Sequence, residues 1–308
     1  MRHCRILILV SEPKNPHRNI GEYEVDFMKL YDDRISPCFA KVIRHLPFIS
    51  ESFLYQKRWK KDLNVYDWII TFDASVNKKA LCYIDKRKCS EKMILVFDNR
   101  IGKRERELHY CAERLGIRQV TYSDLDAQKY NIRFVPQFWD YERYRKAVRL
   151  PEQPQEDKWD LIFIGRAKKR LEKIKEIERN VQQEGLKTNF WIVSDKAEEG
   201  THSQARSYES YLQDVLRSNA ILDVVGENNW GLTWRPMEAL FLKKKLITNY
   251  SDIKKSDFYE AYHENIMILE NGNENQIGDF LKKPYESCAM ELKKYTYEGW
   301  LDQLCKLN

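Results

Sequence analysis

Two residues of opposite charge, Arg235 and Glu238, are the first candidates for chemistry in this sequence. A Gly-containing loop, residues 230–236, leads into them, and an apolar-faced helix is expected to begin just after Pro236. The N–H groups and the dipole of a helix start favour an anion, and the Arg235 guanidinium adds a fork that suits phosphate. The Glu238 carboxylate can accept from vicinal hydroxyls such as those of ribose. A nucleotide sugar needs this combination, although residues three apart also form plain ion pairs on helix surfaces.

A second candidate corner follows an expected strand at residues 159–164. There Gly165 allows a ligand to approach the backbone closely, and Arg166 with the basic residues 168–170 supplies positive charge. The pattern predicts a diphosphate-binding site. The alternative is a tight turn with a solvated basic face, because a single glycine is weaker evidence than a complete glycine-rich phosphate motif.

Acidic residues follow expected strands in the first half of the chain. Asp124 and Asp126 form a DxD sequence, which either coordinates a divalent metal with a nucleotide diphosphate or caps a helix. We favour the cap, because phosphate-binding side chains are not evident nearby, and we expect no metal site. Asp73 ranks ahead of His17 and Asp98 as a candidate general base.

Composition and charge restrict the class of protein. The 308 residues include 53 basic and 47 acidic side chains, and no long basic stripe with stacking aromatics, so a nucleic-acid partner is not expected. The net charge of +6 is compatible with loose attraction to the anionic inner face of a membrane. The apolar run near the N-terminus is too short to span a bilayer and lacks a cleavage site. Seven scattered cysteines suit reduced thiols, so a cytoplasmic protein is expected.

Apolar strands alternate with helices in both halves of the sequence. In the first half we expect strands at 4–10, 67–72, 92–97, 119–122 and 131–135, and helices at 21–45, 77–86 and 105–115. In the second half we expect strands at 159–164, 190–193, 220–225, 246–249 and 264–269, and helices at 171–184, 208–218, 237–242, 275–282 and 286–306. This alternation predicts an α/β fold with parallel sheets covered on both faces, in which ligands bind beyond the carboxyl ends of the strands.

A polar segment with two prolines, residues 150–158, separates the two halves and is the expected linker. We therefore predict two Rossmann-like doubly wound domains facing a cleft, at residues 1–149 and 150–285. Four aromatic side chains before the linker could line a sugar or lipid acceptor site, but packing between domains is the favoured interpretation: Phe138, Trp139, Tyr141 and Tyr144.

The run RPMEALF at residues 235–241, with the following strand, resembles glycosyltransferases of the GT-B fold. It looks most like bacterial lipopolysaccharide and capsule biosynthesis transferases, including the CgeB-like group, over residues 159–285. In retaining GT-B enzymes a Glu-x7-Glu element lies here, and its second Glu, which holds the donor ribose, aligns with Glu238. The first Glu falls on Trp230, so either Glu227 substitutes for it or the chain belongs to another group, such as an inverting one.

The resemblance implies a hexosyltransferase that moves a sugar from a nucleotide-diphosphate donor to a surface polysaccharide or lipid-linked acceptor. Glu238 would bind ribose, and in an inverting enzyme Asp73 would deprotonate the acceptor. The diphosphate would be held without a metal or other cofactor by four features: Gly165, Arg166, Arg235 and the N–H groups near Thr233. The last segment, residues 286–308, would cross back to the first domain, which usually holds the acceptor.

Two other classes stay open. One is a metal-dependent transferase of the GT-A fold that uses Asp124 and Asp126. The other is a non-catalytic protein that keeps a nucleotide-sugar pocket without turnover, which the absence of the first Glu favours.

Overall fold

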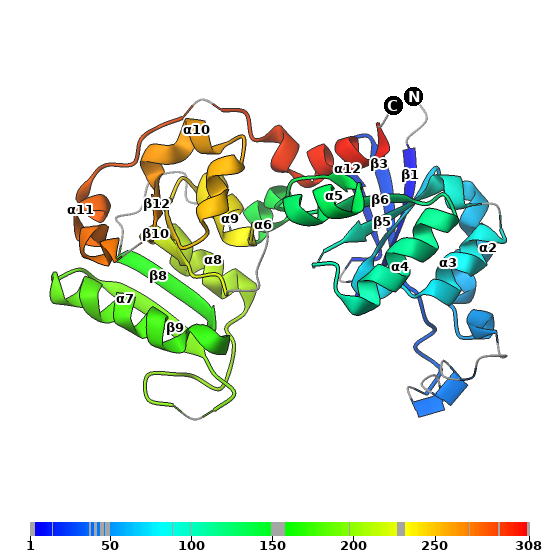
Figure 1. Ribbon diagram of the computed structural model, residues 1–308, viewed down its shortest axis with the longest axis horizontal. Coiled ribbons are helices and arrows are strands. Elements are labelled where there is room, and N and C mark those ends of the chain that lie inside the picture. The colour runs from blue at the N-terminus through cyan, green and yellow to red at the C-terminus, as the bar shows by residue number, and fades with distance from the viewer. Residues whose placement is uncertain are drawn as a thin grey trace. The chain divides into compact units, whose positions relative to one another are not determined.

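The computed structural model describes residues 4–306, apart from 14, 37, 40, 41, 44, 45, 47–49, 88, 99, 149–157, 197, 227–231, 271 and 289. The chain forms two compact units, one of Met1–Pro136 with Glu298–Asn308 and one of Gln137–Tyr297. Each unit is a mainly parallel sheet packed against helices (Figure 1). No helix in the described part of the chain is long and apolar enough to cross a membrane.

The first unit contains a seven-stranded sheet. Its strands are β1 (Cys4–Val10), β2 (His17–Ile20), β3 (Tyr23–Lys29), β4 (Trp68–Phe72), β5 (Met93–Phe97), β6 (Arg118–Thr121) and β7 (Arg133–Phe134). They lie in the order β2-β3-β1-β4-β5-β6-β7, and all neighbours are parallel except β2 and β3. The strand order reverses at β1, which places a topological switch point between β1 and β4.

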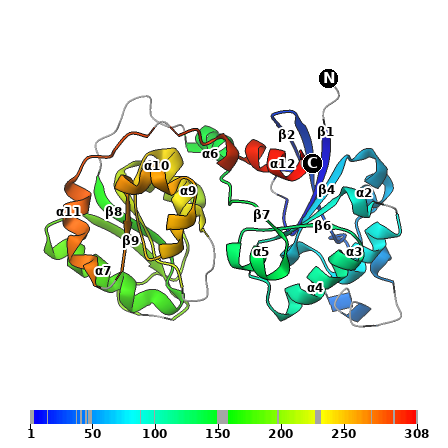
Figure 2. The ribbon, with the colours of Figure 1, turned by 45° about the horizontal axis from the view of Figure 1, so that its top comes forward.

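Helices cover both faces of this sheet. They are α2 (Lys57–Asp62), α3 (Lys78–Asp85), α4 (Lys103–Arg114), α5 (Asp124–Tyr130) and α12 (Tyr297–Cys305). On one face the apolar side chains of α2, α3 and α4, such as Trp59 and Leu81, pack on Leu7 and Leu95 of the sheet. On the opposite face lies α12, drawn in red in Figure 2. Its Trp300 stacks on Phe72 of β4 with 6.2 Å between ring centroids.

The expected helix at residues 21–45 is wrong over its first part. Residues Tyr23–Lys29 instead form β3, which pairs along its whole length with β1. Gly21, at φ +57°, allows the tight turn that folds β2 back onto β3. The charged residues of β3 looked helical in isolation, but pairing with a buried strand decides the conformation.

The second unit contains a five-stranded parallel sheet in the order β12-β11-β10-β8-β9. Its strands are β8 (Trp159–Arg166), β9 (Thr188–Val193), β10 (Ser218–Asp223), β11 (Lys245–Thr248) and β12 (Ile266–Ile268). Its helices are α6 (Tyr141–Val148), α7 (Leu171–Gln183), α8 (Tyr208–Leu216), α9 (Trp234–Leu242), α10 (Tyr259–Tyr262) and α11 (Ile277–Lys282). The order reverses at β8, so a switch point lies between β8 and β10.

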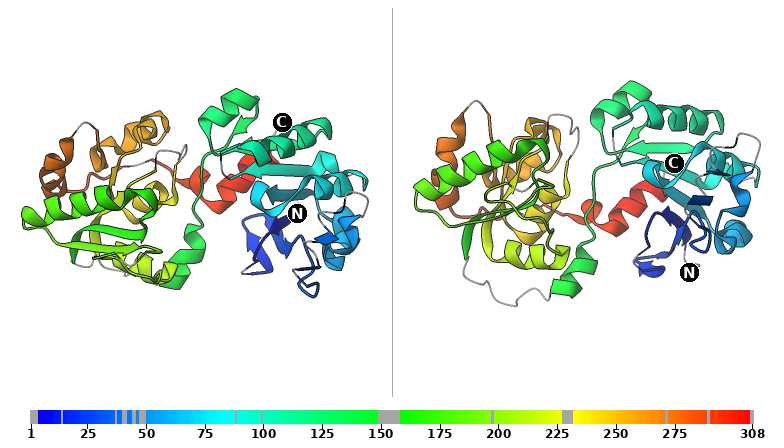
Figure 3. Two further views of the ribbon diagram at one scale, coloured as in Figure 1. Left: turned by 60° about the horizontal axis from the view of Figure 1, so that its bottom comes forward. Right: turned by 90° about the horizontal axis from the view of Figure 1, so that it is seen from below.

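Alternate residues of β8 enter two different cores. Ile162 and Ile164 pack with the apolar faces of α8 and α9, whereas Leu161 and Phe163 pack with α7. Figure 3 shows α7 lying along one face of this sheet. The apolar run Leu161–Ile164 in the middle of β8 is therefore explained by burial on both faces, as expected for a doubly wound sheet.

The boundary between the units falls after Pro136, not at residue 149. Trp139 belongs to the core of the second unit: its backbone N donates to the Tyr295 carbonyl at 2.9 Å, and its Nε1 donates to the Tyr208 hydroxyl at 2.7 Å. Tyr144 and Tyr141 are part of the same core, so three of the four aromatic residues before the linker pack within the second unit. Most of the expected linker, residues 150–157, lies outside the described residues.

The C-terminal helix is shorter than expected. The predicted helix at 286–306 is wrong in its first half, since α12 begins only at Tyr297 after the short turn Lys293–Tyr295. Residues Glu298–Asn308 are part of the first unit, where Asp302 accepts a hydrogen bond of 2.7 Å from the Tyr23 hydroxyl.

Lys245 is fully buried and holds the end of α11. Its ammonium donates to the carbonyls of Phe280 at 2.6 Å and of Lys283. Lys245→Met leaves these carbonyls without a donor and is expected to lower the free energy of unfolding by about 2–3 kcal/mol. Urea unfolding measures this, with the exposed Lys243→Met as the matched control, which should change stability by less than about 0.5 kcal/mol. Equal unfolding midpoints for the two variants would contradict this role.

Candidate functional site

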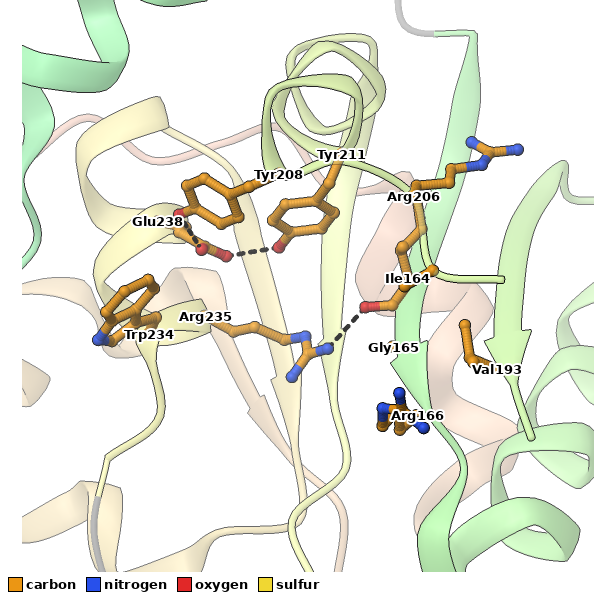
Figure 4. Close-up of a pocket in the computed structure, with 11 residues that line it drawn as sticks. Ile164, Gly165, Arg166, Val193, Arg206, Tyr208, Tyr211, Trp234, Arg235 and Glu238 are labelled. Atoms are coloured by element: carbon orange, nitrogen blue, oxygen red, sulfur yellow. Dashed lines mark hydrogen bonds between the residues drawn. The ribbon is translucent and has the colours of Figure 1, made fainter. Parts of the chain in front are cut away.

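A pocket of about 300 Å³ opens at the carboxyl edge of the second sheet (Figure 4). Strands β8 and β9 end at it, and α8 and α9 form its other side. The residues that line it are Ile164, Gly165, Arg166, Val193, Ala205, Arg206, Tyr208, Tyr211, Trp234, Arg235 and Glu238. The pocket therefore lies at the switch point, where open parallel sheets bind their ligands.

The Arg235 guanidinium lies directly against Gly165. Its Nη2 donates to the Ile164 carbonyl at 2.8 Å, and a Cβ on residue 165 would come within 2.7 Å of the same nitrogen (Figure 4). Its Nη1 is 3.5 Å from Oδ1 of Asp223. Within the described part of the chain neither Arg235 Nε nor Asp223 Oδ1 has a hydrogen-bond partner, although both atoms are buried. Buried polar atoms are normally satisfied, so this corner suits a polar ligand.

Thr233 organises the start of α9. Its hydroxyl donates to Asp223 at 3.0 Å and accepts from the backbone N–H of Arg235 at 3.3 Å, which makes it the N-cap. The helix begins at Trp234, before Pro236, contrary to the expected start. This is possible because residues in the first turn have no intrahelical acceptor for their N–H groups, so proline loses no hydrogen bond there.

Two further arginines lie behind the pocket and at its edge. The Arg170 guanidinium donates to the carbonyls of Arg166 at 2.8 Å and of Val224. Burial lowers the pKa of Arg170, and the neighbouring Arg235 charge adds to this effect while Asp223 opposes it. The Arg166 side chain is exposed and pairs with Asp195 at 2.8 Å, an ion pair worth less than about 1 kcal/mol that an anion can displace.

The Glu238 carboxylate is 2% exposed and is held by two tyrosines. The Tyr208 hydroxyl donates to Oε1, and the Tyr211 hydroxyl donates to Oε2 at 2.5 Å (Figure 4). Burial raises the pKa of Glu238, whereas the two tyrosine hydrogen bonds and the Arg235 charge lower it. The alternative of a surface ion pair between Arg235 and Glu238 is wrong, because Glu238 is buried, the Arg235 side chain is only 20% exposed, and Arg235 pairs with Asp223.

Trp234 lies at the rim of the pocket and is 46% exposed. Its ring meets the Tyr208 ring edge-to-face, with 5.9 Å between centroids. An exposed indole at the rim of a polar pocket can pack against a flat ligand group.

Asp73 belongs to the other unit, at the switch point of the first sheet. It follows β4 and is 4% exposed, and its Oδ1 accepts from the backbone N–H of Asp98 at 3.2 Å. The loops after β1 and β4 meet beside it, where the Ser11 and Ser75 hydroxyls are 3.2 Å apart. Burial raises the pKa of Asp73 to about 6.

The raised pKa predicts a specific pH dependence of stability. The folded state binds the Asp73 proton more tightly than the unfolded chain, whose carboxyl titrates near 3.8, so the stabilisation present at low pH is lost between about pH 4 and 6. The loss is about 3 kcal/mol. Asp73→Asn lacks this titration and should become more stable relative to the wild type as the pH rises. Parallel urea unfolding at pH 4, 5, 6 and 7 measures the difference, and a constant difference would contradict the assignment.

The two aspartates of the DxD sequence do not cap the helix as the sequence predicted, and Asp126 instead holds a neighbouring loop. Ser123, not an aspartate, is the N-cap of α5, since its Oγ accepts from the backbone N–H of Asp126 at 3.2 Å. Asp126 is buried, and its Oδ2 accepts from the backbone N–H of Ile101 at 2.9 Å. Among the residues that the structure describes, no group of three or more His, Cys, Asp or Glu side chains could hold a metal ion.

The structure thus brings Gly165, Arg166, Arg235 and Glu238 to one pocket, with Thr233 beside it, while Asp73 lies in the first unit. Sequence reasoning included Arg170 among the basic residues of this corner, but it missed three residues that position the set: Tyr208, Tyr211 and Asp223. Asp223 lies inside the strand expected at 220–225, and only the structure, in which β10 ends at Asp223, places it at the carboxyl end of a strand. The tyrosines are three residues apart on an amphipathic helix, which is a weak signal.

The sequence matches no protein-family model and no curated protein. Among solved structures, the chain is similar to an alpha-glucosyltransferase in complex with UDP and a 13-mer DNA containing a central A:G mismatch, at 13% identity and a TM-score of 0.57. The match covers 97% of this chain and 95% of that one. A DNA-modifying beta-glucosyltransferase aligns at 15% identity with a TM-score of 0.41, over 90% and 87% of the two chains. The full-length match confirms the predicted fold class, two Rossmann-like domains of the GT-B type.

Proposed function

We propose that this protein is a glycosyltransferase that binds a nucleotide-diphosphate sugar in the pocket of its second domain. The observation that carries the proposal is the convergence of a glycine, two arginines and a buried glutamate at the switch point of a GT-B fold. The fold comparison supports it, because the similar structure contains UDP. Two observations disfavour the metal-dependent GT-A alternative. The fold is of the GT-B type, and Asp126, one of the two metal ligands that this alternative requires, is buried and bonded to the backbone of Ile101.

In this proposal the diphosphate binds between the ends of β8 and α9. Gly165 leaves the backbone open, Arg235 presents its guanidinium at the pocket floor, and Arg166 exchanges Asp195 for phosphate. Backbone N–H groups near Thr233 add the partial positive charge of the helix start. These cations stabilise the charge that develops on the leaving diphosphate, so the reaction proceeds without a metal.

Glu238 binds the ribose hydroxyls of the donor. A carboxylate has about four acceptor positions, and Tyr208 and Tyr211 occupy one on each oxygen. The tyrosines fix the orientation of the carboxylate and leave capacity for the two hydroxyls.

In the transfer, an acceptor hydroxyl attacks the anomeric carbon as the bond to the diphosphate oxygen breaks. If the enzyme inverts, Asp73 accepts the hydroxyl proton, since a carboxyl with a pKa of about 6 is ionised at neutral pH and is more basic than an ordinary aspartate. A retaining enzyme needs no such base.

We further propose that the acceptor is anionic. The first unit has 27 basic and 20 acidic residues, whereas the second has 26 and 27, so the positive charge of the chain is concentrated in the unit expected to hold the acceptor. A lipid-linked or acidic surface glycan of the lipopolysaccharide or capsule type, met at the cytoplasmic face of the membrane, fits this charge. DNA is the second candidate, because the same charge favours it and the similar structure contains DNA. That comparison gives no support to the expectation that the protein has no nucleic-acid partner.

Thermal-shift measurements test the donor site. UDP, GDP, CMP and their sugar conjugates are added with and without EDTA, and a ligand at 100 times its Kd adds about 2.7 kcal/mol of stability. One nucleotide class should stabilise the wild type in EDTA and fail to stabilise Glu238→Ala. Binding that requires a divalent ion and tolerates Glu238→Ala would reject the site, and binding without consumption of the sugar conjugate with any acceptor would indicate a non-catalytic protein.

Transfer assays with the donor identified in this way then test the acceptor. Lipid-linked glycans, acidic polysaccharides and duplex DNA are compared at low and high salt. Transfer to an anionic acceptor should weaken as salt rises. Salt screens the attraction between the basic first unit and the acceptor, and it makes the release of counterions from the acceptor less favourable. Equal transfer to neutral and anionic acceptors would contradict this part of the proposal.

A further inference from the structure

A second cavity, of about 620 Å³, lies in the first unit and shares no residue with the donor pocket. It is formed by the turn Glu51–Phe53, by α3 and by the end of α4, and Figure 1 shows α3 and α4 side by side. Its volume is in the range of small-molecule sites.

The charge around this cavity is positive. Glu51 is the one carboxylate among the described lining residues, and it is already neutralised, with Lys79 Nζ at 3.3 Å and the Asn77 amide donating at 3.0 Å. Lys86 and Arg114 also line the cavity, are exposed, and form no ion pair with any described residue. An anion between these two side chains would therefore not have to displace a carboxylate.

One residue that lines the cavity, Tyr55, has a buried hydroxyl. The residue is 1% exposed, and the hydroxyl has no hydrogen-bond partner among the residues that the structure describes. The ring of Tyr83, another lining residue, meets the Tyr55 ring edge-to-face at 5.3 Å. Burial, followed by the charge of nearby Glu51, raises the pKa of Tyr55, so the hydroxyl stays neutral and can donate. A buried donor without an acceptor is costly unless a ligand supplies one.

We propose that this cavity binds a phosphate monoester carried on a hydroxylated ring, such as a sugar phosphate or a nucleoside monophosphate. Lys86 and Arg114 hold the phosphate, the Tyr55 hydroxyl donates to a ring or hydroxyl oxygen, and the Tyr83 ring forms an apolar wall. The site is separate from donor binding and does not depend on the proposed transferase activity.

Isothermal titration calorimetry tests this with glucose 6-phosphate, uridine 5′-monophosphate, inorganic phosphate, glucose and uridine. The two phosphate monoesters should bind more tightly than inorganic phosphate, glucose or uridine, and the tighter of them identifies the source. Lys86→Gln combined with Arg114→Gln should weaken binding at least about tenfold. The exposed Lys61→Gln on α2 is the matched control and should leave binding unchanged. Glu238→Gln in the donor pocket should leave the binding of glucose 6-phosphate unchanged, because this probe has no ribose for that pocket.

Tyr55→Phe separates a ligand role from a structural one. Because the hydroxyl has no partner, its removal should leave the Tm of the unliganded protein equal or higher, while binding of the monoesters weakens about threefold or more. The proposal is overturned if no probe binds below about 10 mM, or if inorganic phosphate binds as well as the esters. It is also overturned if the binding of glucose 6-phosphate survives the double variant or is lost in Glu238→Gln. A lower Tm with unchanged binding in Tyr55→Phe also overturns it.

Discussion

An Arg235→Ala variant is expected to transfer sugar about 100- to 1,000-fold more slowly than the wild type, with the loss mainly in kcat. The guanidinium lies at the pocket floor and the side chain is 20% exposed, so water screens its charge on the leaving diphosphate only in part. Release of the nucleoside diphosphate from the donor identified by thermal shift measures the rate.

The controls must separate charge from fold. Arg179→Ala, an exposed arginine on α7, should be as active as the wild type. Arg235→Ala leaves Asp223 buried without its cation and is expected to lose stability, so Tm is measured in parallel. Gly165→Ala is the independent variant: its Cβ would come within 2.7 Å of Arg235 Nη2, displacing the guanidinium while the Arg235 and Asp223 charges remain. Full activity in a folded Gly165→Ala and Arg235→Ala would rule out the assigned role.

A Glu238→Gln variant is expected to bind the donor nucleotide about 100-fold more weakly. The amide keeps the volume of the side chain and one acceptor oxygen, but it loses the charge and the second acceptor that two ribose hydroxyls require. The direct readout is discrimination: the wild type should prefer the ribonucleotide over its 2′,3′-dideoxy form, and Glu238→Gln should bind the two more nearly alike. Calorimetric Kd values for both nucleotides measure this.

A merely structural glutamate would behave differently. Tyr208 and Tyr211 would lose their acceptor in Glu238→Ala, which should cost several kcal/mol of stability whether or not ribose binds. In that case Glu238→Gln would lower Tm but leave the ratio of ribonucleotide to dideoxynucleotide affinity unchanged. An unchanged ratio would assign Glu238 to packing alone.

The sequence by itself determined the α/β class and most strands, because a strand buried on both faces must be apolar over its buried part, as in β1 and β8. It also identified Gly165, Arg235 and Glu238, since glycine after a strand and charge at a helix start are local signals. It failed at β3, where polar residues adopt a strand only because β1 lies beside them. It also failed at Trp139, whose place in the second core depends on Tyr208 and Tyr295.

Only the tertiary structure decided what the charged residues contact. Arg235 reaches the carbonyl of Ile164, 71 positions away, and Glu238 meets two tyrosines at 27 and 30 positions. A spacing of three residues suggested that Arg235 and Glu238 pair with each other, but burial made other partners available to both. Local patterns specify which side chains a helix or strand presents. The partners of those side chains are set by which elements the sheet order brings together, and that order depends on contacts far apart in the chain.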